Sequence, residues 1–144
     1  MGAVLYQSGV SFRVWAPHAN AVFVVGDFND WQPDASPLAV EQDGYWSAAV
    51  PGAKAGQSYK FRILNGDQEL FRVDPYAREV TNSAGDSVIF DPAFDWSEDD
   101  FRTPPWNEMT IYEMHVGTFN RKHADRPGDF DDAIEKLEYL RNLG

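Results

Sequence analysis

Apolar and polar residues alternate with a period of two along much of the chain before residue 91. In the first clear run, Val10, Phe12 and Val14 alternate with Ser11 and Arg13. The runs that alternate in this way, or that are apolar throughout, are 10–16, 20–26, 45–51, 57–64, 69–73 and 86–90. Because successive side chains of a strand point to opposite faces, each run predicts a short strand.

Turn sequences separate these runs. They are "GDFND", "QDG", "PGAKAG", "NGD" and "NSAGD", all rich in the residues that favour tight turns. Short strands at this spacing predict a two-sheet antiparallel β-sandwich. The run 20–26 is apolar on both faces, which predicts a central strand.

The pattern changes after residue 91. Residues 91–108, "DPAFDWSEDDFRTPPWNE", show no period and predict a linker or a strap along a surface. Residues 109–116 are too apolar for a solvated strand and are typical of a strand covered on both faces, as in a parallel sheet. We therefore expect three segments: a sandwich over 1–92, a linker over 93–108 and a strand–helix unit over 109–144.

A helical stripe ends the chain. Its apolar members are Phe130, Ala133, Ile134, Leu137, Leu140 and Leu143, which recur at helical spacing. Asp129 is placed to cap the start of this helix, and Gly144 suits the position just past its end. A strand followed by a helix is half of a βαβ repeat.

Composition limits the kinds of partner and cofactor that the chain can bind. The net charge is −11 and Lys and Arg form no cluster, which argues against nucleic acid and an anionic membrane as partners and is compatible with a neutral polysaccharide. The chain has no Cys, and its three His lack the spacing of metal ligands. We predict no metal and no cofactor. Without a visible signal peptide, we expect a cytoplasmic protein.

Several stretches resemble a known enzyme family. "FRVWAPHANAVFVVGDFNDW", "YKFRI" and "DPYA" are similar to the N-terminal sandwich of glycogen-branching enzymes, a glycogen-binding module (CBM48-like) also found in the β subunit of AMP-activated kinase. "IYEMHVGTF" followed by "GDFDDAIEKLEYLRNLG" resembles the first strand and helix of the α-amylase-family (glycoside hydrolase family 13) barrel. The resemblance implies a mainly β chain: an immunoglobulin-like antiparallel β-sandwich, then the start of a truncated (β/α)₈ barrel.

The resemblance also implies a function. A (β/α)₈ barrel takes roughly 250 residues, so we expect this chain to be the N-terminal fragment of a longer enzyme that acts on α-1,4-glucan. The favoured parent is a 1,4-α-glucan branching enzyme that works by double displacement. Its partners would be glycogen or maltodextrin and the remainder of the barrel, and exposed apolar faces on 109–144 predict self-association.

Four residues match sugar-contacting positions of the kinase module: Trp31, Lys60, Phe71 and Ser87. The matching tryptophan stacks on a sugar ring there, and the matching lysine donates to hydroxyls. Phe71 replaces a second tryptophan and Ser87 falls near an asparagine, two departures that predict weaker binding. The alternatives are a Trp31 that seals the core and a solvated Lys60.

No catalytic residue is expected in this chain. Glu113 and His115 would share one face of the barrel-like strand, but the resemblance implies an interior packing role for them. The family's catalytic carboxylates lie on later barrel strands, so we predict that these 144 residues alone are inactive.

Other functions stay open at this point. "HVGTF" and "PPWNE" also resemble malto-oligosyl-trehalose trehalohydrolases, so the parent could be a glycosidase of that or an α-amylase-like kind. A non-enzymatic glycogen-targeting module and an immunoglobulin-like interaction domain are further alternatives. Residues 109–144 argue against the glycogen-targeting module, because such modules do not continue into a barrel strand.

Overall fold

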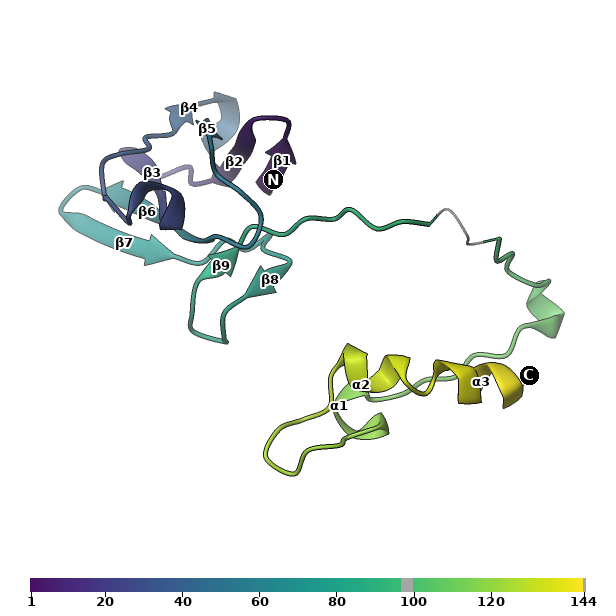
Figure 1. Ribbon diagram of the computed structural model, residues 1–144. Coiled ribbons are helices and arrows are strands. Elements are labelled where there is room, and N and C mark those ends of the chain that lie inside the picture. The colour runs from purple at the N-terminus through teal and green to yellow at the C-terminus, as the bar shows by residue number, and fades with distance from the viewer. Residues whose placement is uncertain (97–99, 144) are drawn as a thin grey trace. The chain divides into compact units, whose positions relative to one another are not determined.

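The structure is a computed structural model that describes residues 1–96 and 100–143. Its internal contacts divide the chain into two compact units, Met1–Asp95 and Trp96–Gly144. Figure 1 draws both units. Each unit is described by itself below.

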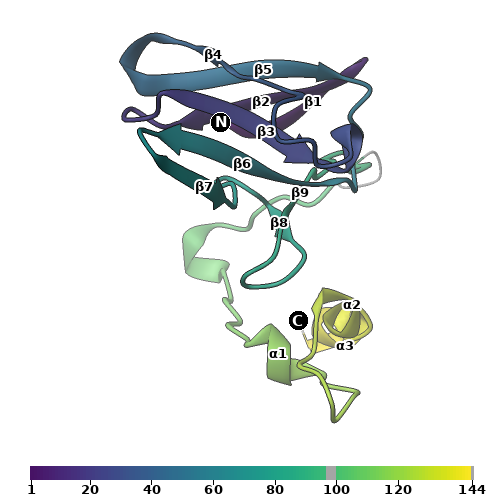
Figure 2. The same ribbon diagram turned by 90° about the vertical axis from the view of Figure 1, so that its left-hand side faces the viewer.

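The first unit is a β-sandwich. Its strands are β1 (Gly2–Tyr6), β2 (Gly9–Trp15), β3 (Ala21–Gly26), β4 (Ala39–Val40), β5 (Tyr45–Pro51), β6 (Ser58–Asn65), β7 (Gln68–Arg72), β8 (Glu79–Val80) and β9 (Ser87–Val88). One sheet has the order β1–β2–β5–β4 and the other β3–β6–β9–β8, with β7 also paired to β6. All pairs are antiparallel. Figure 2 shows the two sheets stacked face to face, which confirms the predicted fold.

The core lies between the sheets, on the faces that the alternation predicted. Phe12 on β2 and Tyr59 and Phe61 on β6 are fully buried. The Tyr59 ring centroid lies 5.0 Å from that of Phe12 and 5.9 Å from that of Phe61, in edge-to-face geometry. Each of these side chains contributes about 1.5–3 kcal/mol of hydrophobic stabilisation, and the aromatic geometry adds to it.

The strand β3 lies at the end of its sheet, so the expectation of a central strand was wrong. The following loop covers its free edge: the Leu38 N–H donates to the Val22 carbonyl at 2.8 Å. Its outer face is covered as well, because the Arg62 guanidinium lies 5.1 Å from the centroid of the Phe23 ring. A loop and a long cationic side chain therefore do what neighbouring strands would do at the centre of a sheet.

Three polar groups are buried together at one side of the core. The Tyr59 hydroxyl donates to Asp74 Oδ2 at 2.6 Å, and the Asp74 N–H donates to Ser87 Oγ at 2.8 Å. Burial, and then the bond to Asp74, raise the pKa of Tyr59, so this phenol stays a neutral donor. The "DPYA" stretch that begins at Asp74 is thus anchored to the sandwich.

The second unit is mostly irregular. It contains a 3₁₀ turn (Trp106–Glu108) and the helices α1 (Val116–Phe119), α2 (Phe130–Ile134) and α3 (Leu137–Leu143). The strand expected over 109–116 is not formed: residues 109–115 carry no regular structure and α1 begins at Val116. A strand needs a neighbour for its backbone hydrogen bonds, and no described strand pairs with this segment.

The single helix expected over 129–144 is divided into α2 and α3. The Asp132 carbonyl accepts from Asn120 Nδ2 at 2.6 Å, and the Lys136 N–H bonds to the Ala133 carbonyl at 2.9 Å, one residue short of the α-helical partner. The predicted cap at Asp129 is confirmed, since its side chain accepts from the Asp132 N–H. The predicted terminal position of Gly144 lies outside the described residues.

Candidate functional site

Trp31 lies at the end of a tight turn after β3. A 3₁₀ turn (Asp27–Asn29) follows the strand, and the Trp31 N–H returns to the Gly26 carbonyl at 2.9 Å. Asp30 and Trp31 both have left-handed backbones, with φ of 53° and 57°. This region costs a residue with a side chain about 1–3 kcal/mol, so the rest of the turn must hold Trp31 in place.

Side chains supply that restraint. Asn29 Oδ1 accepts from the Gly26 N–H at 3.0 Å, and Asn29 Nδ2 donates to the Ser36 hydroxyl at 3.0 Å. Gly26 is required here because a Cβ on it would lie 2.3 Å from the Ser58 carbonyl oxygen. The turn is therefore closed on both sides, against β6 and against the following loop.

The Trp31 indole is fixed at the surface. Its Nε1–H donates to Asp27 Oδ1 at 2.8 Å, and Asp27 Oδ2 accepts from the Ser58 N–H at 2.7 Å. The side chain keeps 37% of its surface exposed. Trp31 thus combines a restrained orientation with access to solvent, whereas Trp46 packs against the core with its indole N–H bonded to the Ala16 carbonyl.

Lys60 lies on the outer face of β6, opposite Val25 of β3. Its ammonium forms an ion pair with Asp86 at 2.8 Å. Asp86 is itself held by Thr81, since the Asp86 N–H donates to Thr81 Oγ1 and the Thr81 N–H donates to the Asp86 carbonyl, each at 2.9 Å. An ammonium carries three N–H donors, so Lys60 can donate to another group while it pairs with Asp86.

Phe71 shares this outer face. It lies directly opposite Arg62 in the β6–β7 pair, and 46% of its surface is exposed. Arg62 forms ion pairs with Glu69 on β7 at 2.5 Å and with Asp34 in the Trp31 loop at 2.6 Å. The hydrogen bond to Glu69, and then that to Asp34, raise the pKa of Arg62. Arg62 therefore ties the strand that carries Phe71 to the loop that carries Trp31.

Ser87 lies on the opposite face of the same sheet. It pairs with the buried Tyr59, is 0% exposed, and its hydroxyl accepts from the Asp74 N–H. The structure thus gathers Lys60 and Phe71 on one face, with the Trp31 loop anchored to it, and leaves Ser87 inside the core. The neighbour Asp86 reaches the surface in its place.

Three residues of this surface were not singled out by the sequence: Asp27, Arg62 and Asp86. Arg62 falls within the predicted strand 57–64, and no role was predicted for it. Asp27 stands four residues before Trp31, a spacing that a turn could have suggested. Nothing in the sequence links Lys60 to Asp86, because they are 26 positions apart and meet only through the pairing of β6 with β9.

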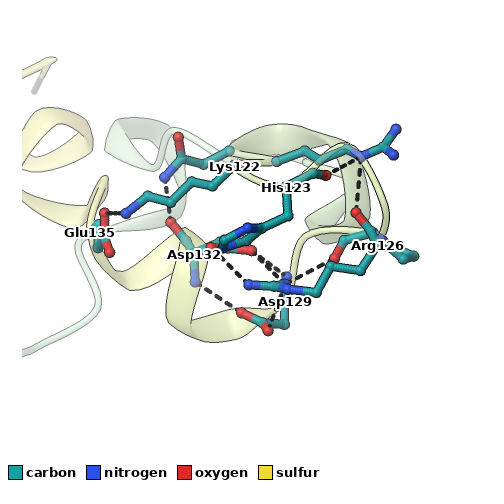
Figure 3. A network of polar contacts seen from close by, with 9 residues as sticks. Lys122, His123, Arg126, Asp129, Asp132 and Glu135 are labelled. Atoms are coloured by element: carbon teal, nitrogen blue, oxygen red, sulfur yellow. Dashed lines mark hydrogen bonds and ion pairs between the residues drawn. The ribbon is translucent and has the colours of Figure 1, made fainter.

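The second unit contains a separate polar network (Figure 3). Arg126 pairs with Asp129 and Asp132, each at 2.9 Å, and Lys122 pairs with Glu135. Burial acts to raise the pKa of Asp132, but the hydrogen bonds from Arg126 and the Asp129 backbone outweigh it and lower that pKa. The contacts of Arg126 with Asp129 and Asp132 close the loop before α2 onto the helix start.

The other sequence candidates in this unit are not organised as a site. Glu113 is exposed in the irregular segment, and His115 Nδ1 lies 3.2 Å from the Thr118 hydroxyl at the start of α1. Within residues 1–96 and 100–143, no group of three or more acidic or histidine side chains could hold a metal ion. None of the helices described there is long and apolar enough to cross a bilayer.

Comparisons with known proteins identify the family of the chain. Residues 1–77 match carbohydrate-binding module 48, the isoamylase N-terminal domain. The whole chain is 37% identical to the 1,4-alpha-glucan branching enzyme GlgB of Corynebacterium jeikeium and 40% identical to that of Lactiplantibacillus plantarum. It spans 21% and 24% of those two proteins.

Solved structures of enzymes with related names also resemble this chain. A Salmonella typhimurium protein assigned as an alpha amylase matches 99% of this chain with 23% of its own, at a TM-score of 0.80 and 29% identity. A Paenibacillus barengoltzii pullulanase variant solved with maltotetraose matches 63% of this chain with 14% of its own, at a TM-score of 0.56 and 33% identity.

Proposed function

Because the chain belongs to the carbohydrate-binding module 48 family, we propose that its sandwich binds α-1,4-glucan on the outer face of β6 and β7. The site consists of Trp31 as a stacking surface, Phe71 as a second apolar contact, and Lys60 with Asp86 as a polar pair. Ser87 is buried, so Asp86 takes the edge position that the resemblance gave to Ser87.

The observation that carries this proposal is the Trp31 turn. Two consecutive left-handed residues are costly, and they hold an indole ring at the surface with its N–H already bonded. A tryptophan that only sealed the core would not need this arrangement. A restrained ring loses little entropy when a flat ligand face lies against it.

The polar pair complements the ring. Sugar hydroxyls both donate and accept hydrogen bonds; Lys60 offers donors and Asp86 offers acceptors at one point. Exchange of water for protein partners yields little net energy, whereas stacking removes apolar C–H surface from water. We expect Trp31 to dominate an affinity of about 0.1–1 mM, or roughly −4 to −5.5 kcal/mol.

We further propose that the chain is the N-terminal part of a 1,4-α-glucan branching enzyme. The identities of 37% and 40% to two branching enzymes support this assignment. A glycosidase parent is the second candidate, favoured by the likeness to an assigned alpha amylase and to pullulanases. The 144 residues alone are expected to bind and not to react.

Activity of the full-length protein distinguishes the two parents. With amylose as substrate, a branching enzyme shifts the iodine spectrum without a matching rise in reducing ends, whereas a hydrolase raises reducing ends. The 144-residue chain serves as the control and should do neither. Turnover proportional to the concentration of this chain would contradict the proposal.

Binding is tested by calorimetric titration of maltoheptaose into the 144-residue chain and two matched variants. Trp31→Ala should weaken binding at least tenfold. Trp15→Ala removes an equally large exposed ring from β2, in the other sheet; this side chain is 58% exposed, and the change should leave affinity within about twofold. Equal losses in both variants, or no saturable heat with the unaltered chain, would refute the site.

A further inference from the structure

Asp27 is the residue through which the Trp31 indole is connected to the sheet. Its two carboxylate oxygens are both used: Oδ1 accepts from the indole at 2.8 Å, and Oδ2 accepts from the Ser58 N–H at 2.7 Å. Ser58 is the first residue of β6, two positions before Lys60. One exposed side chain therefore spans from the ring to the strand that carries Lys60.

Only a side chain with two acceptors fits this position. Asparagine has one acceptor oxygen and would turn its amide donors toward either the indole N–H or the Ser58 N–H. Charged acceptors also give the stronger hydrogen bonds. The carboxylate thus matches two donors that a neutral isostere of the same size satisfies only in part.

The backbone explains why the indole needs a tie of its own. Hydrogen bonds from Asn29 hold the turn, but they act on the Gly26 N–H and on Ser36, not on the Trp31 side chain. A side chain at the end of a surface turn otherwise samples several rotamers. The bond to Asp27 is made by the indole N–H itself and restricts the orientation of the ring.

We infer that Asp27 is a positioning residue that holds the Trp31 indole in place and occupies its N–H, so that this ring contacts glucan through its face alone. The inference rests on the proposed glucan binding and deepens it. Asp27 itself touches no ligand. Recognition of hydroxyl groups then falls to other side chains, Lys60 and Asp86 among them.

Three consequences separate this role from a purely structural one. Trp31→Phe should weaken binding about as much as Asp27→Ala does, because the ring face is kept but the hydrogen bond that orients the ring is lost with the N–H. Asp27→Ala should weaken binding about three- to tenfold in the unaltered chain, the loss of one charge-assisted hydrogen bond that orders the ring. In the Trp31→Phe background, Asp27→Ala should change affinity less than about 1.5-fold, because no indole N–H remains.

The experiment is a double-mutant cycle on maltoheptaose affinity, with Asp27→Asn as an intermediate variant and Asp67→Ala as the control. Asp67 is an exposed acid in the β6–β7 turn, so its removal tests the loss of one negative charge alone. The Trp31 indole N–H is followed by NMR in the ligand-free proteins. It should exchange with water at least threefold faster in Asp27→Ala, with the remaining amide spectrum unchanged.

Each outcome is decisive. The inference is supported if Asp27→Ala lowers affinity in the unaltered chain but not in the Trp31→Phe chain, and if the indole N–H exchanges faster. An equal loss in both backgrounds overturns it, because Asp27 would then act through Ser58. No loss in either background overturns it as well, while the Trp31→Ala result leaves glucan binding standing. Absence of binding in the unaltered chain overturns both proposals.

Discussion

The two units of the chain bury their apolar residues to very different extents. In the sandwich, residues of β2, β3 and β6 such as Phe12, Val24 and Phe61 are fully buried. Among the described residues 100–143, Asp132 and Ala133 are the ones classed as buried. Both regions contain apolar runs, such as 10–16 and 109–116, so the difference in burial also reflects what each segment has to pack against.

The comparison shows that periodicity specifies a face but not its cover. Each strand of the sandwich finds a partner within Met1–Asp95, and its alternating pattern becomes a buried face. The run 109–116 finds no partner strand among the described residues and stays irregular. Most of the apolar stripe of α2 and α3, including Phe130 and Leu137, is likewise exposed, although Ala133 is buried.

The largest contrast is expected between two phenylalanines. Phe12→Ala removes a ring that packs between Tyr59 and Phe28 and should lower the free energy of unfolding by about 3–5 kcal/mol. Phe130→Ala removes an exposed ring of α2 and should change it by less than about 0.5 kcal/mol. Urea unfolding followed by fluorescence measures both. Similar losses would mean that the second unit has a core of its own.

The exposed stripe should also drive association. Leu137→Asp removes an apolar contact worth about 1.5–3 kcal/mol when buried and should shift the 144-residue chain from dimers or larger species toward monomers. Sedimentation velocity over a range of concentrations measures this shift. A shortened chain that ends at Asp95 is the control and should be monomeric. A monomeric 144-residue chain at every concentration would contradict the prediction.

A smaller effect is expected at the start of α2. Asp129→Ala removes the helix cap and should cost this turn about 1 kcal/mol. Asp131→Ala lies in the same first turn without a capping bond and should cost only a few tenths of a kcal/mol. Amide hydrogen exchange of Ala133 compares the two variants. Equal protection in both would show that the cap does not stabilise the second unit.

The smallest effect concerns pH. The pKa of Asp132 is lowered in the folded chain, so its ion pair with Arg126 stabilises α2 above the ordinary aspartate pKa of about 3.9. That contribution is lost as the pH falls below this value through the lowered pKa. In Arg126→Ala, the midpoint of the Asp132 carboxyl titration, followed by NMR, should move to higher pH. Asp129 and His123 lie in the same network and should be followed as well.

The sequence predicted the elements whose partners lie within the same unit. The alternation at Val10, Phe12 and Val14, and the cap at Asp129, depend on local chemistry and were confirmed. The position of β3 at the sheet end was missed, because a loop and Arg62 cover its apolar residues and no pattern reports that. The strand over 109–116 was wrong because strand formation requires a partner that periodicity cannot supply.

The candidate surface shows the same limit. Trp31, Lys60 and Phe71 were proposed from the resemblance, and their places at the surface are compatible with it. Asp86 and Arg62 were missed because their roles depend on contacts between strands far apart in sequence. Ser87 was predicted to contact sugar but lies in the core, one residue from Asp86. Adjacent residues of a strand face opposite sides, so a shift of one position moves a side chain from the surface into the core.

The most direct test of this account is to map where maltoheptaose acts on the chain. Amide NMR shifts should saturate and cluster on the Trp31 loop, β6 and β7, around Lys60 and Phe71, with no shifts over residues 100–143 or on the outer face of β1, β2 and β5. That result would make the sandwich the sugar-binding unit. Shifts confined to residues 100–143, or no saturable shifts at several tens of millimolar sugar, would contradict the account's central claim.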